Sequence, residues 1–146
     1  MDSTEAALQK ALGHVAASVD AYVSDLIEYT RIPSVSTDPA RRADVEAAAR
    51  WTAERLKRAG LTDVRTLPTA GHPVVVGRLH HDPSLPTVIF YGHYDVQPPE
   101  PLELWTSPPF EPEVRDGKVY GRGACDDKAG VLTAVQAVEA YLASGA

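Results

Sequence analysis

The chain has 146 residues, a formal net charge of −6 and a single cysteine. This length allows one domain with a hydrophobic core but not two. The acidic balance, without a cluster of lysine or arginine, argues against a nucleic-acid-binding surface. One cysteine excludes an internal disulfide and favours a reducing compartment. Because no apolar run approaches the ~20 residues of a membrane helix, and the acidic start is unlike a signal peptide, we expect a cytoplasmic protein without membrane contact.

Apolar residues at steps of three and four predict three helices. The first is expected from Asp2 or Ser3 to just before Pro33, because a proline pushes the preceding residue out of the helical region. The second begins at Asp38-Pro39, an N-cap followed by a first-turn proline, and ends at Gly60. The third is expected over residues 127–143.

The strand pattern predicts a sheet between these helices. Residues 64–67 and 74–79 are rich in β-branched residues and are expected to form a hairpin. Residues 87–91 are apolar on both faces and predict a buried central strand. The Asp-Gly turn within 114–120 predicts a second hairpin. The fold class is therefore α/β, with a mixed β-sheet flanked by helices in one domain over 1–146.

A histidine and an aspartate, His93 and Asp95, directly follow the predicted central strand. Ligands of open α/β sheets bind at the carboxyl ends of strands. In extended backbone both side chains point to the same side, so the carboxylate can hold one ring nitrogen while the other binds a metal ion. The alternative is a polar loop at a strand end, and His-x-Asp by itself does not decide between them.

Two further carboxylates, Asp126 and Asp127, stand where the third helix is expected to begin, after Gly121 and Gly123. One interpretation is a cap that meets the positive end of the helix. The other is a carboxylate that bridges two metal ions, with glycines allowing the backbone to come close. Imidazole and carboxylate together are typical of a zinc site. Both interpretations stay open, because one acid can cap while the other binds.

The remaining reactive side chains have simpler interpretations. Cys125 is expected to be a small buried residue rather than a nucleophile, because the two aspartates that follow it oppose thiolate formation. His80 and His81 are expected in a solvated loop. Trp105 and Phe110, in the proline-rich stretch 97–112, line a pocket or anchor that stretch locally.

Taken together, three segments resemble a family of two-zinc exopeptidases and amidohydrolases that includes glutamate carboxypeptidase, acetylornithine deacetylase, aminoacylase and carnosinase. The segments are residues 26–36 (LIEYTRIPSVS), 91–98 (YGHYDVQP) and 121–128 (GRGACDDK), in the expected order. The second segment, with the stretch from Trp105 to Pro112, looks most like the dipeptidase branch that holds carnosinase.

The resemblance implies a site and a reaction. His93 would bind one zinc ion, Asp95 would be a catalytic residue that orients His93, and Asp126 would bridge both metals. Two Zn²⁺ ions per active site, or Mn²⁺ or Co²⁺ in their place, would serve hydrolysis of dipeptides or similar small amides. The complete enzyme would be a homodimer with a small peptide substrate.

The resemblance also implies parts that this sequence lacks. The family's general base lies in a Glu-Glu pair, and no Glu-Glu occurs here. We therefore expect the N-terminal part of a zinc-exopeptidase catalytic domain, without the lid domain, that alone binds zinc weakly and does not hydrolyse peptides. One alternative is an N-acyl-amino-acid deacylase of the same family. Another is a non-catalytic remnant that binds a partner through an exposed sheet edge.

Overall fold

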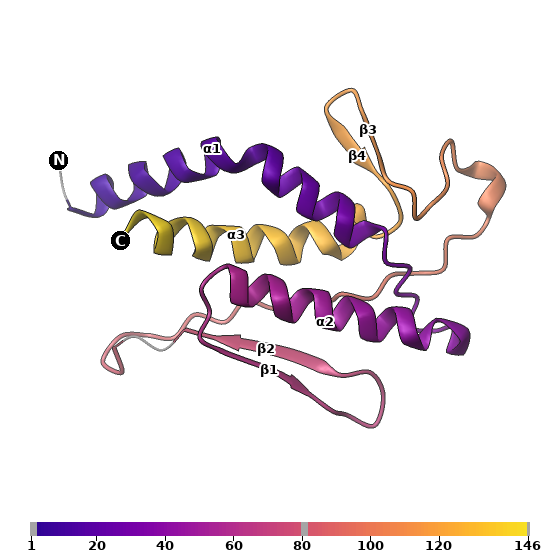
Figure 1. Cartoon of the computed structure of the whole chain (residues 1–146), viewed down its shortest axis with the longest axis horizontal. Helices are drawn as coiled ribbons and strands as arrows, with labels where there is room; N and C mark the ends of the chain where they lie inside the picture. Colours follow the sequence, from indigo (N-terminus) through magenta and orange to yellow (C-terminus); the bar gives the residue numbers. More distant parts are fainter. Residues whose placement is uncertain (1–2, 80–81, 146) are drawn as a thin grey trace.

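Three helices form one layer of the molecule. The computed structural model describes residues 3–79 and 82–145. Helix α1 spans Ser3–Thr30, α2 spans Arg42–Arg58 and α3 spans Ala129–Ser144. Figure 1 shows α1 and α3 side by side in opposite directions, with α2 next to them. None of the helices in these residues is long and apolar enough to cross a membrane.

The helix ends agree with the sequence signals. The Asp38 carboxylate accepts a hydrogen bond from the Ala40 backbone N–H at 2.9 Å and caps a short 3₁₀ turn, Pro39–Arg41, that leads into α2. Gly60 and Gly145 follow α2 and α3 with φ of +96° and +68°. The proposed helix cap Asp2 and the histidines His80 and His81 lie outside the described residues.

Both predicted hairpins are confirmed. Strand β1, Asp63–Leu67, pairs antiparallel with β2, Val74–Arg78, and the two pack on α2. Strand β3, Glu113–Arg115, pairs antiparallel with β4, Lys118–Tyr120. Asp116 and Gly117 turn the chain with φ of 50° and 72°, as a two-residue hairpin turn requires.

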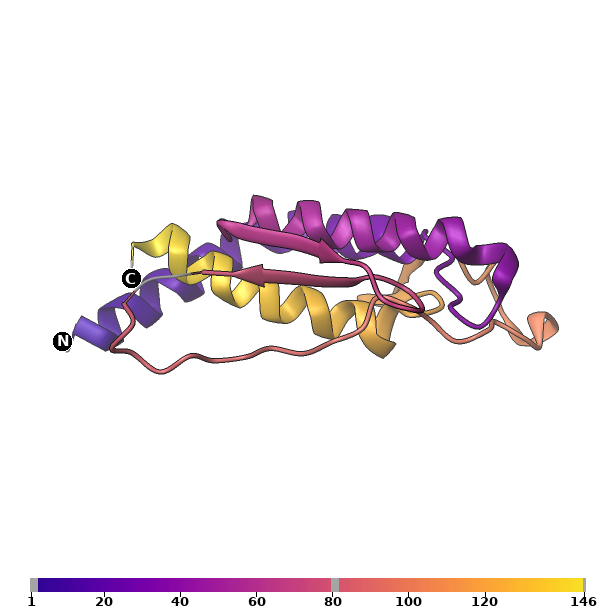
Figure 2. The ribbon, with the colours of Figure 1, turned by 90° about the horizontal axis from the view of Figure 1, so that it is seen from below.

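The prediction of a buried central strand at 87–91 is wrong for this chain. Val88, Ile89 and Tyr91 are 72%, 86% and 93% exposed. Figure 2 shows the segment as a bare trace that runs apart from β1 and β2. A strand that is apolar on both faces needs neighbours at both edges and cover on both sides, and nothing in the described residues supplies them. Over the described residues the fold is therefore α/β with two separate two-stranded sheets in place of one mixed sheet.

The core lies where the three helices meet. Tyr29, Ala48 and Leu132 are buried there, one from each helix. The Tyr29 ring stacks on Trp51 with a centroid distance of 4.2 Å. Thr52 donates its hydroxyl hydrogen to Ala48 O, so the Tyr29 hydroxyl must donate in its 2.5 Å contact with Thr52 Oγ1. The end of α1 is thereby fixed against α2, next to the segment that follows 87–91.

Candidate metal centre

His93 and Asp95 lie in a short extended segment that is tied to the rest of the fold at Val96. Val96 is buried, forms a parallel bridge with Val35 and donates its N–H to Ser34 O at 3.0 Å. The His93 Nδ1 atom faces both Asp95 Oδ1 and Asp95 O, each at 3.1 Å. Because both partners only accept, Nδ1 carries a hydrogen, and Nε2 is directed the other way.

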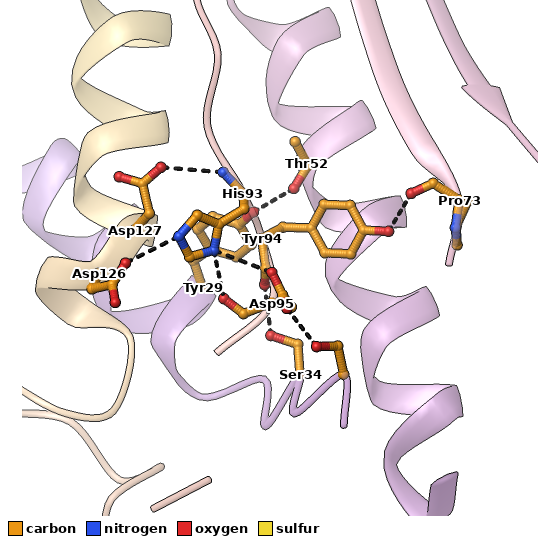
Figure 3. A network of polar contacts seen from close by, with 10 residues as sticks. Tyr29, Ser34, Thr52, Pro73, His93, Tyr94, Asp95, Asp126 and Asp127 are labelled. Atoms are coloured by element: carbon orange, nitrogen blue, oxygen red, sulfur yellow. Dashed lines mark hydrogen bonds and ion pairs between the residues drawn. The ribbon is translucent and has the colours of Figure 1, made fainter. Parts of the chain in front are cut away.

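Asp126 meets the other side of the imidazole. Its Oδ1 atom lies 3.0 Å from His93 Nε2, although the two residues are 33 apart in sequence (Figure 3). The turn Ala124–Lys128 that carries Asp126 begins after Gly123, which has φ +82°. A Cβ at Gly123 would lie 2.2 Å from Val96 Cγ1, so only glycine lets this turn pack on the His93 segment. The Asp126 side chain remains 76% exposed.

Asp127 contacts the same histidine through its backbone. Its Oδ2 atom accepts a hydrogen bond from the His93 N–H at 3.1 Å. Neither Asp126 nor Asp127 makes a side-chain cap on α3, which begins without one. Of the two interpretations left open by the sequence, capping of the helix is therefore not observed, because both carboxylates contact His93 instead.

Lys128 holds this turn against the end of α1, a role that pattern reading did not assign. It is fully buried, and its Nζ donates to Tyr29 O at 2.9 Å and to Ile32 O at 2.7 Å. The spacing of Lys128 from the apolar residues of α3 is the sequence signal that indicates its burial. Lys128 precedes Leu132 and Val135 by four and seven residues, which places a lysine on the apolar face of α3.

The electrostatics of the site favour a positive charge on the imidazole. Partial burial lowers the pKa of His93, but hydrogen bonds and charge interactions with Asp95 and Asp126 outweigh burial and raise it above its ordinary value. A metal ion at Nε2 must displace this proton, so protons and metal compete for the same nitrogen.

The donor set fits a divalent metal in part. A histidine nitrogen whose other ring N–H is held by a carboxylate, facing a second and exposed carboxylate, has the chemistry of a zinc ligand pair. Among the described residues, however, no group of three or more His, Cys, Asp or Glu side chains is placed to hold a metal ion. The structure thus brings His93, Asp95 and Asp126 together as predicted, and their roles toward a metal stay predictions.

The structure also tests the expectations for Cys125 and Trp105. Cys125 is exposed, which corrects the prediction of a buried residue: the turn Ala124–Lys128 leaves it open to solvent, together with the neighbouring Asp126. The Trp105 indole N–H donates to Pro99 O at 2.7 Å, as expected of a local anchor for the proline-rich stretch.

Comparison with known proteins adds a family. Residues 89–146, which include His93 and Asp126, match the model of peptidase family M20/M25/M40. The chain is 33% identical over 138 residues to the Cys-Gly metallodipeptidase DUG1 of Saccharomyces cerevisiae, which covers 85% of this chain and 29% of that protein. Over 61 residues it is 56% identical to the succinyl-diaminopimelate desuccinylase of Dechloromonas aromatica, which covers 42% of this chain and 16% of that protein.

The chain is also similar to a solved structure. The crystal structure of human carnosine dipeptidase 1 superposes with a TM-score of 0.85 at 33% identity, covering 93% of this chain and 31% of that one. The chain spans less than a third of the length of each of these relatives.

Proposed function

The chain belongs to peptidase family M20/M25/M40, as its three motifs predict, and we propose that it carries part of the active site of a metal-dependent dipeptidase. In this proposal His93 and Asp126 are metal ligands and Asp95 orients His93. The observation that carries the proposal is the imidazole held between two carboxylates, with Nδ1 3.1 Å from Asp95 and Nε2 3.0 Å from Asp126.

Each of these side chains has a definite task. Asp95 holds the hydrogen on Nδ1, which leaves the lone pair of Nε2 for a cation. Asp127 fixes the His93 backbone, and the exposed Asp126 carboxylate, 3.0 Å from Nε2, would be the second ligand of a cation bound there. A bound Zn²⁺, or Mn²⁺ or Co²⁺ in its place, supplies Lewis-acid activation of a water molecule and of the scissile carbonyl.

The same geometry sets a limit on this chain alone. Catalytic zinc uses three protein ligands and an open position, and hydrolysis needs a general base near the water. His93 and Asp126 supply two donors and neither is free to act as the base. We therefore expect weak zinc binding and no peptidase activity from these 146 residues, with full activity, and the homodimer that the resemblance implies, in a complete enzyme.

A deacylase is the second candidate within the family. The match to a succinyl-diaminopimelate desuccinylase covers a stretch of 61 residues at 56% identity, higher than the identity to the dipeptidase. Both reactions hydrolyse an amide, so the same imidazole and carboxylates serve either one.

A partner-binding remnant is the candidate of another class. The exposed apolar segment 87–91 supports it, because unpaired strand-forming backbone invites association with another chain. This alternative predicts that His93→Ala leaves the biological role of the chain intact, whereas an enzyme loses activity.

A zinc titration tests the metal site directly. Zn²⁺ is added to the ¹⁵N-labelled chain while the His93 ring signals are followed by NMR, which detects weak binding. We expect the His93 signals to shift first, and His93→Ala and Asp126→Asn to weaken binding at least tenfold. His14→Ala and Asp20→Asn, both on α1, are matched controls and are expected to bind like the unchanged chain. Zinc binding that is indifferent to His93→Ala contradicts the proposal.

Substrate profiling separates the two enzyme candidates. A complete open reading frame that contains this sequence is assayed with Cys-Gly, β-Ala-His and N-succinyl-diaminopimelate, each with Zn²⁺, Mn²⁺ or Co²⁺. We expect the two dipeptides to be cleaved faster. Faster cleavage of the succinyl compound identifies a deacylase instead.

A further inference from the structure

The connector between α1 and α2 lies against the segment that carries His93. Ser34 Oγ donates to Tyr94 O at 2.7 Å, and Val96 N–H donates back to Ser34 O at 3.0 Å. Val35 and Val96, both buried, form the bridge between these two contacts. The connector therefore sets the position of the backbone on both sides of Asp95.

Ser36 extends this contact to the side chain of Asp95. Its Oγ donates to Asp95 Oδ2 at 2.5 Å. The other oxygen of the same carboxylate, Asp95 Oδ1, faces His93 Nδ1 at 3.1 Å (Figure 3). The two oxygens of one carboxylate thus have separate partners, one on each side. With both oxygens engaged, rotation of the carboxylate away from the imidazole breaks two contacts instead of one.

Ser36 is itself held from the far side. His72, in the loop between β1 and β2, places Nε2 3.1 Å from Ser36 O. A carbonyl only accepts, so His72 Nε2 carries the hydrogen. The Tyr94 hydroxyl donates to Pro73 O in the same loop. The segment from Tyr94 to Val96 is thus held by contacts from both the loop and the connector.

We propose that Ser36 is a positioning residue for the metal centre, acting through Asp95 to fix the tautomer and orientation of His93. The proposal rests on the proposed function of His93 as a metal ligand. Ser36 does not touch the imidazole or Asp126 in the described structure. It controls how firmly Asp95 holds the hydrogen on Nδ1, and hence how fully the lone pair of Nε2 is available to a cation.

The expected loss of zinc affinity can be scaled from groups that hydrogen-bond metal ligands in other proteins. Loss of a group that hydrogen-bonds a ligating histidine or carboxylate typically lowers metal affinity 10–100-fold. Ser36 acts one bond further out, so Ser36→Ala is expected to weaken Zn²⁺ binding by about tenfold, the low end of that range. Ser36→Thr keeps the hydroxyl and should restore the affinity.

Two NMR measurements on the 146-residue chain test this. The first is the tautomer of neutral His93, read from its ring ¹⁵N shifts without metal. The second is the Zn²⁺ titration described above. We expect one Nδ1–H tautomer in the unchanged chain and in Ser36→Thr, and a mixture in Ser36→Ala. Ser84→Ala is the matched control, because it removes the same type of hydroxyl-to-carboxylate bond, Ser84 Oγ to Asp82 Oδ1 at 2.7 Å, on an exposed loop.

The outcomes distinguish the positioning role of Ser36 from the metal-binding role of His93. If Ser36→Ala shows the unchanged tautomer and zinc affinity, Ser36 has no positioning role, while the metal site stands. If the unchanged chain binds no zinc at His93, the metal site fails, and the tautomer comparison still decides whether Ser36 orients the ring. If Ser36→Ala does not fold, Ser36→Thr and Ser36→Val replace it, since they differ in the hydroxyl but are similar in size.

Discussion

Replacing Arg55 by methionine should sharply destabilise the helix layer that supports the candidate metal centre. Arg55 is 3% exposed, and its guanidinium joins Asp25 of α1, at 2.6 Å, to Glu139 of α3, also at 2.6 Å. Removing one partner of a buried ion pair costs ~3–5 kcal/mol, because the remaining charges lose their compensation. Asp25 keeps Arg58 at 3.2 Å, and Glu139 is 22% exposed and can rehydrate. We therefore expect a loss near the lower end, about 3 kcal/mol.

Urea denaturation followed by circular dichroism measures this change as a difference in unfolding free energy at an unchanged m-value. Arg50→Met is the matched control, because Arg50 is exposed on the same helix and should change stability by less than ~0.5 kcal/mol. A loss for Arg55→Met as small as that for Arg50→Met would refute the reasoning and show that the two carboxylates do not need the guanidinium.

Three further predictions concern other parts of the chain. Ile89→Lys should reduce self-association, measured by sedimentation velocity, without lowering stability. Leu104→Lys, at a similarly exposed apolar residue, should leave self-association unchanged, and equal effects of the two variants would mean that general hydrophobicity drives association. Gly123→Ala should lower the unfolding free energy, measured by urea denaturation, by at least ~1 kcal/mol more than Gly145→Ala. Both residues have positive φ, but only at Gly123 would the added Cβ clash with a neighbour. Equal losses would contradict the packing argument. Burial lowers the pKa of Lys128 to about 7, so above that pH the unfolded chain binds more protons than the folded one. The unfolding free energy should therefore rise between pH 7 and ~10, by at most ~1.4 kcal/mol per pH unit. Lys128→Met should flatten that slope, and an unchanged slope would show that Lys128 does not titrate there.

The sequence predicts the local elements well because their signals are local. Asp38, Gly60 and the Asp116-Gly117 turn act within a few residues of themselves, and each does in the structure what its type predicts. The pairing of His93 with Asp126 was predicted from the resemblance of two motifs, since no local rule relates residues 33 apart.

The errors have physical causes that composition does not show. Residues 87–91 have the composition of a buried strand, but burial depends on neighbours that this chain does not place beside them. Arg55 and Lys128 lie on apolar helix faces, and patterning by hydrophobicity passes over charged residues there, although each joins two helical elements. Ser36 was part of a motif but carried no assigned role, because its contact with Asp95 depends on how the connector folds back.

The exposed segment 87–91 is separated from His93 by Gly92 alone. A strand added alongside that segment would restrict the backbone immediately ahead of the imidazole. Assembly and metal binding would then be thermodynamically linked, and reciprocity requires each to change the affinity of the other by the same factor. Where the added strand orders His93 for the metal, zinc would bind the assembled form more tightly than this chain by itself.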